Sequence, residues 1–247
     1  MWKISWNWKR LAQLRVLLLI LFVLMGSNLL YAASQSEVIV VTHLENQAQY
    51  RTSNYADWES LEVGQELLPE YEIKTFPHTR MTMKLGEGSE VRVAPNTHMR
   101  INRQTNMGTG QIDLQLILGK AWAKFRKNLS RQAKLILRTA HAKINIHGTS
   151  YEATVSEDNT QVRVFTGEVA VSDNNQAAQT SNYAPREIAP PHEVSRENWQ
   201  VIVSAFYTIS VSKDQKPGPP QPFHLKSVQN EWIQWNQRRD SKADQDI

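Results

Sequence analysis

Short segments of alternating apolar and polar residues run through the chain between positions 37 and 172. In RMTMKL, Met81, Met83 and Leu85 fall at every second position, with polar residues between them. Because successive side chains of a strand point to opposite faces, this period indicates a strand with one buried face. Comparable segments are 37–41, 89–94, 98–102, 112–116, 134–138, 161–165 and 168–172. Turn residues separate them, so the pattern predicts an all-β domain over 37–172.

The composition of the chain changes after residue 172. Residues 173–215 are polar and contain prolines, which predicts an extended strap. Within it, SRENWQVIVSAFYTI predicts a helix over 195–209 capped by Ser195. The apolar residues on one side of that helix would be Trp199, Ile202, Val203 and Phe206.

The C-terminal residues, 216–247, read as a Pro-rich linker (KPGPPQP) followed by a polar tail. A short docking helix and disorder are both open for this tail. Trp232 and Trp235 lie in it, three positions apart. They are candidate contacts for a partner, because aromatic anchors are common at interfaces, or they dock on the domain itself.

The stretch AKINIHGTSYEATV raises the question of a catalytic site. His147 precedes Gly148, Thr149 and Ser150, which brings a base close to two hydroxyls. The apolar positions change from even to odd across this point: Ile144 and Ile146 before it, Tyr151, Ala153 and Val155 after it. A one-residue slip must be absorbed by a bulge or a corner, and glycine marks such places. We therefore interpret Gly148 as a bend between strand segments.

The first 33 residues have the pattern of a secretory signal peptide or an N-terminal membrane anchor. A basic stretch precedes the apolar run VLLLILFVLM (16–25), and small residues follow at Ala32 and Ala33. A cleaved signal would leave the body in the periplasm, whereas an uncleaved segment over 16–33 would anchor it in the inner membrane. Either way we expect an exported protein that meets the membrane only through this segment.

Charge and cysteine content narrow the classes of function. Four of the 28 Lys and Arg residues lie in positions 1–33, which contain no Asp or Glu, so 24 basic and 24 acidic residues remain in the body. A body without net charge gives no electrostatic case for nucleic-acid binding. The chain contains no cysteine, which excludes disulfides and thiolate sites. The histidines show no metal-ligand spacing, and pairs such as Glu70 and Glu72 suggest solvated surface, so we expect no cofactor or metal.

Several segments together resemble the FecR domain family. They are TAHAKINIHGTSYEATV followed by QVRVFTGEVAV, the opening half 63–101, and LILGKAWAKF. The positions that carry the resemblance are Gly64, Gly86, Gly88, Ser89, Gly119, Trp122, Gly148, Thr149 and Gly167. The resemblance implies an all-β, solenoid-like or rolled-sheet domain on the outer side of a bacterial inner membrane. It supplies no catalytic residues.

Signalling members of that family carry a cytoplasmic segment that binds a sigma factor before their membrane span. Residues 1–15 occupy that place here, so we expect a stand-alone exported FecR-domain protein. The leading hypothesis is a non-enzymatic binding or sensory module that contacts a protein partner of the envelope. The alternatives are a scaffold associated with peptidoglycan or another glycan and, third, a hydrolase.

Overall fold

The computed structural model describes residues 39–85, 89–102, 111–125, 134–174, 199–214 and 216–245. The chain divides into two units, Met1–Ser36 and Glu37–Ile247, and every described residue belongs to the second unit. The signal peptide or anchor predicted over 1–33 therefore lies outside the described residues. Within the described ranges, no helix is both long enough and apolar enough to cross a membrane.

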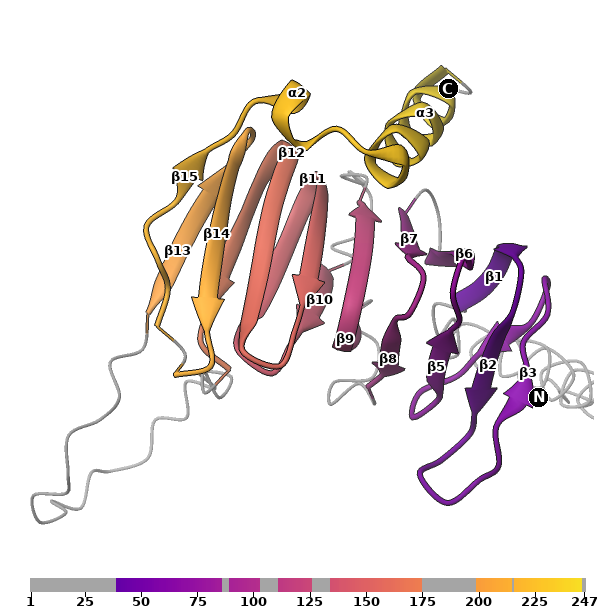
Figure 1. Ribbon diagram of the computed structural model, residues 1–247. Coiled ribbons are helices and arrows are strands. Elements are labelled where there is room, and N and C mark those ends of the chain that lie inside the picture. Colours follow the sequence, from indigo (N-terminus) through magenta and orange to yellow (C-terminus); the bar gives the residue numbers. More distant parts are fainter. Residues whose placement is uncertain are drawn as a thin grey trace, which may run out of the picture. The chain divides into compact units, whose positions relative to one another are not determined.

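Strands dominate the described part of the chain (Figure 1). The strands are β1 (Ile39–Glu45), β2 (Ala48–Arg51), β3 (Glu59–Ser60), β4 (Glu66–Leu67), β5 (Glu72–Thr75), β6 (Arg80–Leu85), β7 (Ser89–Val93), β8 (His98–Ile101), β9 (Gln111–Lys124), β10 (Lys134–Arg138), β11 (Lys143–Val155), β12 (Asn159–Ser172), β13 (Gln200–Ser204), β14 (Tyr207–Ser212) and β15 (Gln221–Pro222). The helices are α2 (Leu225–Val228) and α3 (Glu231–Gln245). The prediction of a mainly β fold is confirmed.

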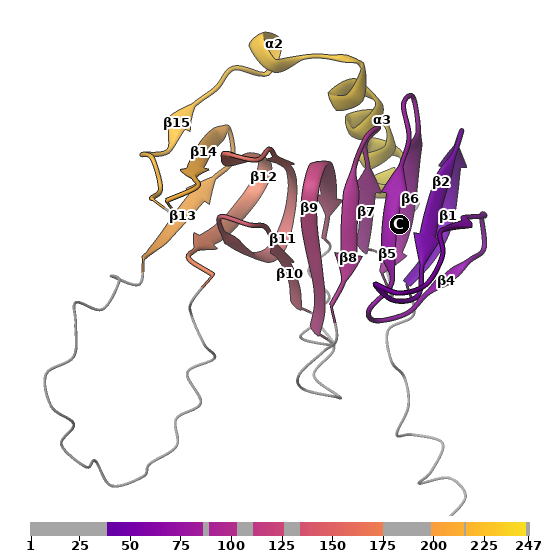
Figure 2. The same ribbon diagram turned by 60° about the horizontal axis from the view of Figure 1, so that its bottom comes forward.

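Two layers arise because the long strands β9, β11 and β12 change pairing partners halfway along their length (Figure 2). Layer I runs in the order β3, β2, β5, β8, first half of β9, β10, first half of β11, second half of β12, β13. Layer II runs β4, β1, β6, β7, second half of β9, second half of β11, first half of β12, β14, β15.

One hydrophobic core lies between the two layers. Ile73 and Met99 point into it from layer I. Val93, Ala153 and Val162 point into it from layer II, and all five residues are fully buried. A fully buried aliphatic side chain stabilises a fold by about 1.5–3 kcal/mol. This core replaces the disulfides that the sequence lacks.

The pairings are those of a rolled antiparallel sheet. Only β9 and β10 pair in parallel among the described strands, and β9, β10 and β11 each pair with the other two, which closes a small ring. These pairings do not confirm the solenoid alternative.

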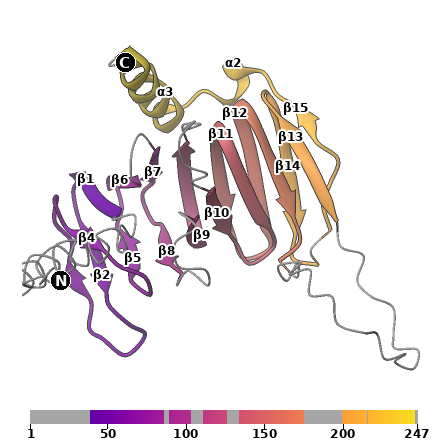
Figure 3. The same cartoon turned by 180° about the vertical axis from the view of Figure 1, so that it is seen from behind.

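The helix predicted over 195–209 is wrong for the residues that the structure describes. Gln200–Ser204 is strand β13 and Tyr207–Ser212 is strand β14, joined by a two-residue turn at Ala205 and Phe206. Both strands pair with β12, so this part of the predicted strap extends the two layers instead (Figure 3). β-Branched residues at most positions of the two strands favour the pleated conformation, and the helical spacing of Trp199, Ile202 and Phe206 was coincidental.

The linker and tail are ordered on the sheet. Pro217 forms a bridge with Val211, and β15 pairs with the start of β14, so the Pro-rich segment follows the sheet edge. Of the two alternatives for the tail, the structure has the helix, α3.

Candidate functional site

Three glycines place the bends at which the long strands pass between layers. Gly119 in β9, Gly148 in β11 and Gly167 in β12 have φ values of +98°, +63° and +72°. At these angles a Cβ atom is strained, so glycine is favoured. The register of β11 against β12 shifts between His147 and Tyr151, which confirms the predicted bulge at Gly148.

The remaining family positions are spread over the fold. Gly64 lies in the turn before β4 with φ +92°. Ser89 begins β7 and is buried, and Thr149 is buried beside the Gly148 bend. Gly86 and Gly88 lie outside the described residues, as does the side chain of His147.

A row of mainly polar side chains crosses the outer face of layer II. The register places Thr82 opposite Arg92, Arg92 opposite Trp122, Trp122 opposite Glu152, and Glu152 opposite Arg163. Arg92, Trp122 and Glu152 are each at most 1% exposed, although they point away from the core. Something must therefore cover this face.

The C-terminal helix covers it. Trp232, Ile233 and Trp235 of α3 are buried in one cluster with Trp122 and Phe165. The Trp122 and Phe165 rings lie 4.4 Å apart, and the two helix tryptophans stack at 5.5 Å. Of the two alternatives for Trp232 and Trp235, the structure has both docked on the chain's own domain, where each is 8% exposed.

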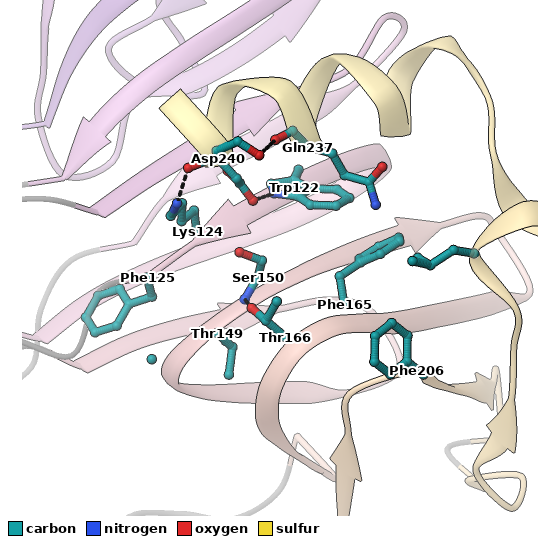
Figure 4. A pocket seen from close by; sticks show the side chains of 13 residues that line it. Trp122, Lys124, Phe125, Thr149, Ser150, Phe165, Thr166, Phe206, Gln237 and Asp240 are labelled. Carbon is teal, nitrogen blue, oxygen red and sulfur yellow. Dashed lines mark hydrogen bonds between the residues drawn. The ribbon is translucent and has the colours of Figure 1, made fainter. Parts of the chain in front are cut away.

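Asp240 fixes the helix through charged hydrogen bonds (Figure 4). Its carboxylate accepts from Arg92 Nη1 at 2.6 Å and from Trp122 Nε1 at 3.2 Å. Its backbone carbonyl accepts from Lys124 Nζ at 2.7 Å. Arg92 Nη1 also lies 3.3 Å from Asn236 Oδ1. Hydrogen bonds to charged groups contribute about 1.5–3 kcal/mol each. We call this set of contacts the Asp240 latch.

An open groove of about 900 Å³ lies beside the latch, between α3 and the strand bends (Figure 4). Aromatic side chains form much of its wall: Phe165, Phe125 and Trp122 are buried there, and Phe206 is 47% exposed. The groove's other lining residues are Lys124, Gly148, Thr149, Ser150, Thr166, Leu225, Gln237, Asp240 and Ser241.

The polar groups of the groove hold the fold. The Ser150 N–H donates to Thr166 Oγ1 at 3.0 Å, which replaces a ladder hydrogen bond lost at the bend. Both carboxylate oxygens of Asp240 accept from Arg92 or Trp122, as described above. A general base needs to reach a nucleophile's proton, and this carboxylate is directed elsewhere. The arrangement suits the binding of an apolar or mixed surface rather than acid–base chemistry.

A second polar cluster, the Glu72 cluster, lies on the outer face of layer I. Glu72 is 2% exposed, so the interpretation of Glu70 and Glu72 as solvated surface is wrong for Glu72. Its carboxylate accepts from Arg51 Nη2 at 2.6 Å, His98 Nε2 at 3.0 Å and Arg100 Nε at 3.0 Å. Burial disfavours the ionised carboxylate, but these hydrogen bonds outweigh it and lower the pKa of Glu72 to about 2.

Trp58 covers the Glu72 cluster. The Arg51 guanidinium lies 4.8 Å and the Lys74 ammonium 4.2 Å from its ring centre, within cation–π range. Burial lowers the pKa of His98, against the opposing effect of Glu72. The charged donors of this cluster thus each contact an acceptor or an aromatic ring, which indicates a structural role.

Metal binding has no support in the described part of the chain, where no three His, Cys, Asp or Glu side chains lie close enough to share an ion. His141, for example, forms a hydrogen bond of 2.9 Å with Thr160 Oγ1 inside the fold.

Sequence reasoning missed Arg92, Asp240 and Arg51 as parts of polar sites. Arg92 and Asp240 lie 148 positions apart, and nothing in SEVRVA or in the tail marks them as partners. The available signal was weak: a single arginine on the outward face of a strand, with an aromatic opposite it.

Residues 71–170 match the protein family described as FecR protein. Two crystal structures of a candidate anti-sigma factor from Parabacteroides distasonis ATCC 8503, at 2.50 Å and 1.65 Å resolution, are similar to this chain. Each has 17% sequence identity and a TM-score of 0.45, and the match covers 64% of this chain and 62% of that one. No curated protein matches the sequence. The segment matched to the family holds β5 to β11, most of β12 and the three bends, so this chain contains a FecR domain over residues 71–170.

Proposed function

We propose that the protein is an exported, non-enzymatic regulatory module of the FecR type, which acts by binding another protein of the bacterial cell envelope. The observation that carries this proposal is the FecR domain over residues 71–170. The resemblance to the signalling members of this family implies a task of recognition in the envelope. Fold alone does not fix function, so the groove has to be consistent with that task.

The groove supports a binding role. Its wall combines buried aromatic rings with the exposed ring of Phe206, so an apolar side chain of a partner would bury area without displacing the core. The side-chain amide of Gln237 can hydrogen-bond a peptide backbone. A segment of a partner protein with one or two apolar side chains fits this chemistry best.

The groove is completed from outside the matched segment. Trp122, Thr149, Ser150 and Phe165 belong to the FecR domain, whereas Gln237 and the rest of α3 come from the C-terminal tail. The Asp240 latch holds these two parts together. The binding surface therefore depends on the whole described unit.

The N-terminal sequence supports placement in the envelope. The basic residues before the apolar run 16–25 would stay in the cytoplasm and the body would reach the periplasm. We propose a periplasmic module, either released by cleavage near Ala33 or anchored by residues 16–33.

Site-specific photo-crosslinking in living cells tests this proposal. A benzoylphenylalanine at position 206 places the reactive group on the groove, and one at Tyr55, which is 100% exposed on the loop after β2, is the matched control. We expect one discrete envelope protein, captured from position 206 and not from position 55 and identified by mass spectrometry together with the mature N-terminus of the chain.

Other outcomes would point elsewhere. Co-sedimentation with purified peptidoglycan, without a protein adduct, would favour a wall-associated scaffold. Equal capture from both positions, or capture from neither, would contradict the groove as the contact site.

A further inference from the structure

Among the strands that the structure describes, four end the two layers, and three of these edges are protected. β3, β4 and β15 end the two layers, and each is only two residues long. They carry Glu59, Glu66 and Pro222, respectively. Short edge strands with charges or proline prevent pairing with other chains.

The fourth edge, as far as the described residues go, lacks this protection. β13 ends layer I with five residues, QVIVS, which contain neither a charge nor a proline. Among the described strands β13 pairs with β12 alone. Ile202, at its centre, is 52% exposed. An uncharged edge of this length with β-branched residues is a template for another strand.

The backbone of β13 has groups free to accept such a strand. The Asp173 N–H donates to Trp199 O at 3.4 Å, immediately before the ladder that pairs Ser172 with Gln200. Hydrogen-bonded and non-hydrogen-bonded pairs alternate along an antiparallel ladder. Counting from that bond, the N–H and C=O groups of Gln200, Ile202 and Ser204 point away from β12.

We propose that β13 pairs with β13 of a second copy of this chain, antiparallel and centred on Ile202. Ile202 then meets Ile202 of the second copy, Gln200 meets Ser204, and Val201 meets Val203. A two-fold axis through Ile202 makes the interface isologous, so layer I continues from one copy into the other. The three residues with outward backbone groups form hydrogen-bonded pairs.

The strand's own composition argues for a second copy as the occupant. A strand that pairs with its own copy must not bring like charges opposite each other, and β13 carries no charged residue. The residues that meet are also matched in kind: a β-branched residue faces a β-branched residue, and an amide faces a hydroxyl. Ile202 is also one of the seven large hydrophobic residues that are exposed among those the structure describes, and pairing with a second copy would bring it against its own equivalent.

Cysteine crosslinking gives a direct test, because the chain has no cysteine of its own. Paired residues of an antiparallel ladder have Cα atoms about 4.5–5.5 Å apart, within the range of a disulfide. We expect Ile202→Cys, in the full-length protein in isolated envelopes treated with a mild oxidant, to form a covalent homodimer. Leu118→Cys is the control, since Leu118 is 45% exposed on β9 and should give no dimer.

The register is tested by two differently tagged copies in one cell. Gln200→Cys on one copy and Ser204→Cys on the other should crosslink, and Gln200→Cys on both copies should give at least about tenfold less dimer, because its partner residue is Ser204. Equal yields would overturn the proposed register. A homodimer from Ile202→Cys no more abundant than from Leu118→Cys, or an adduct with a different protein, would overturn the proposal itself.

A charge test on the purified full-length protein gives an independent measurement. Sedimentation should show Ile202→Lys and Ile202→Glu each shifted to monomer, because like charges meet on the axis, and their mixture returned to dimer. Leu118→Lys should sediment as the unmodified protein does. A wild-type protein that is monomeric throughout, or an Ile202→Lys variant that stays dimeric, would refute the two-fold pairing.

Discussion

Gly119 provides the sharpest test of how the long strands bend. Gly119 has φ +98°, and a Cβ there would lie 2.5 Å from Thr97 Oγ1, 2.6 Å from Thr97 Cα and 2.8 Å from Asn96 O. The backbone strain of alanine at positive φ costs about 1–2 kcal/mol. Overpacking against fixed backbone atoms adds about 1–3 kcal/mol. The lower entropy of the unfolded alanine chain offsets about 0.4–1 kcal/mol of this, so we expect Gly119→Ala to lower the free energy of unfolding by about 3 kcal/mol.

Gly64→Ala is the matched control. Gly64 has nearly the same angle, φ +92°, but nothing lies within 4 Å of its Cβ position. Its strain is partly offset by the lower entropy of the unfolded chain, worth about 0.4–1 kcal/mol, so we expect a loss of about 1 kcal/mol. Urea titration followed by tryptophan fluorescence should separate the two variants by about 1 M in midpoint, for a slope of about 2 kcal/mol/M. Equal losses would refute the argument that crowding by Thr97 makes Gly119 necessary.

Two further predictions concern the polar clusters. Asp240→Ala removes one of the two carboxylates that pair with the buried Arg92, while Glu90 Oε2 stays 2.8 Å from Arg92 Nη2. We expect about 2 kcal/mol lower stability and faster hydrogen exchange in α3, with Lys242→Ala, an exposed site, unchanged. The folded pKa of Glu72, about 2, lies below its ordinary value of 4.5, so its contribution is present above pH 4.5 and is lost as the pH falls toward 2. The wild-type protein should lose about 2 kcal/mol more than Glu72→Gln between pH 6 and pH 3 in urea titrations, and parallel pH curves would contradict this assignment.

The local part of the fold could be predicted from the sequence. Period two identified β6, because Met81, Met83 and Leu85 are buried and the residues between them mostly face outward. The change of parity located the bend at Gly148, since side-chain alternation leaves no other way to keep Ile146 and Tyr151 in one core. Both inferences use only neighbours in the chain.

The helix predicted over 195–209 failed because spacing alone was ambiguous. Trp199, Ile202, Val203 and Phe206 fit a helical stripe, yet Val201, Val203, Ile209 and Val211 fit two strands equally well. The strand conformation is favoured because β13 and β14 both pair with β12. Such a partner is distant in sequence and leaves no local signal.

The polar sites escaped prediction for a related reason. Arg92 and Glu72 look like ordinary surface residues on strands, and only a covering element makes them buried. For Arg92 that element is α3, and for Glu72 it is the loop that carries Trp58. Burial of a charge requires a partner, and the partner's identity depends on the tertiary fold.

The two proposed contact surfaces meet in one hairpin. Phe206 borders the groove, and it follows β13, the proposed dimer edge, by two positions. The Phe206 N–H donates to Val164 O at 2.8 Å, and the Phe223 N–H donates to Phe206 O at 2.9 Å, so the turn is tied to β12 and to the C-terminal segment. A partner that moved Phe206 would therefore have to disturb β12, which is also the strand that holds β13 in place. Because the same strand supports both surfaces, binding in the groove and pairing of two copies are expected to influence each other through β12.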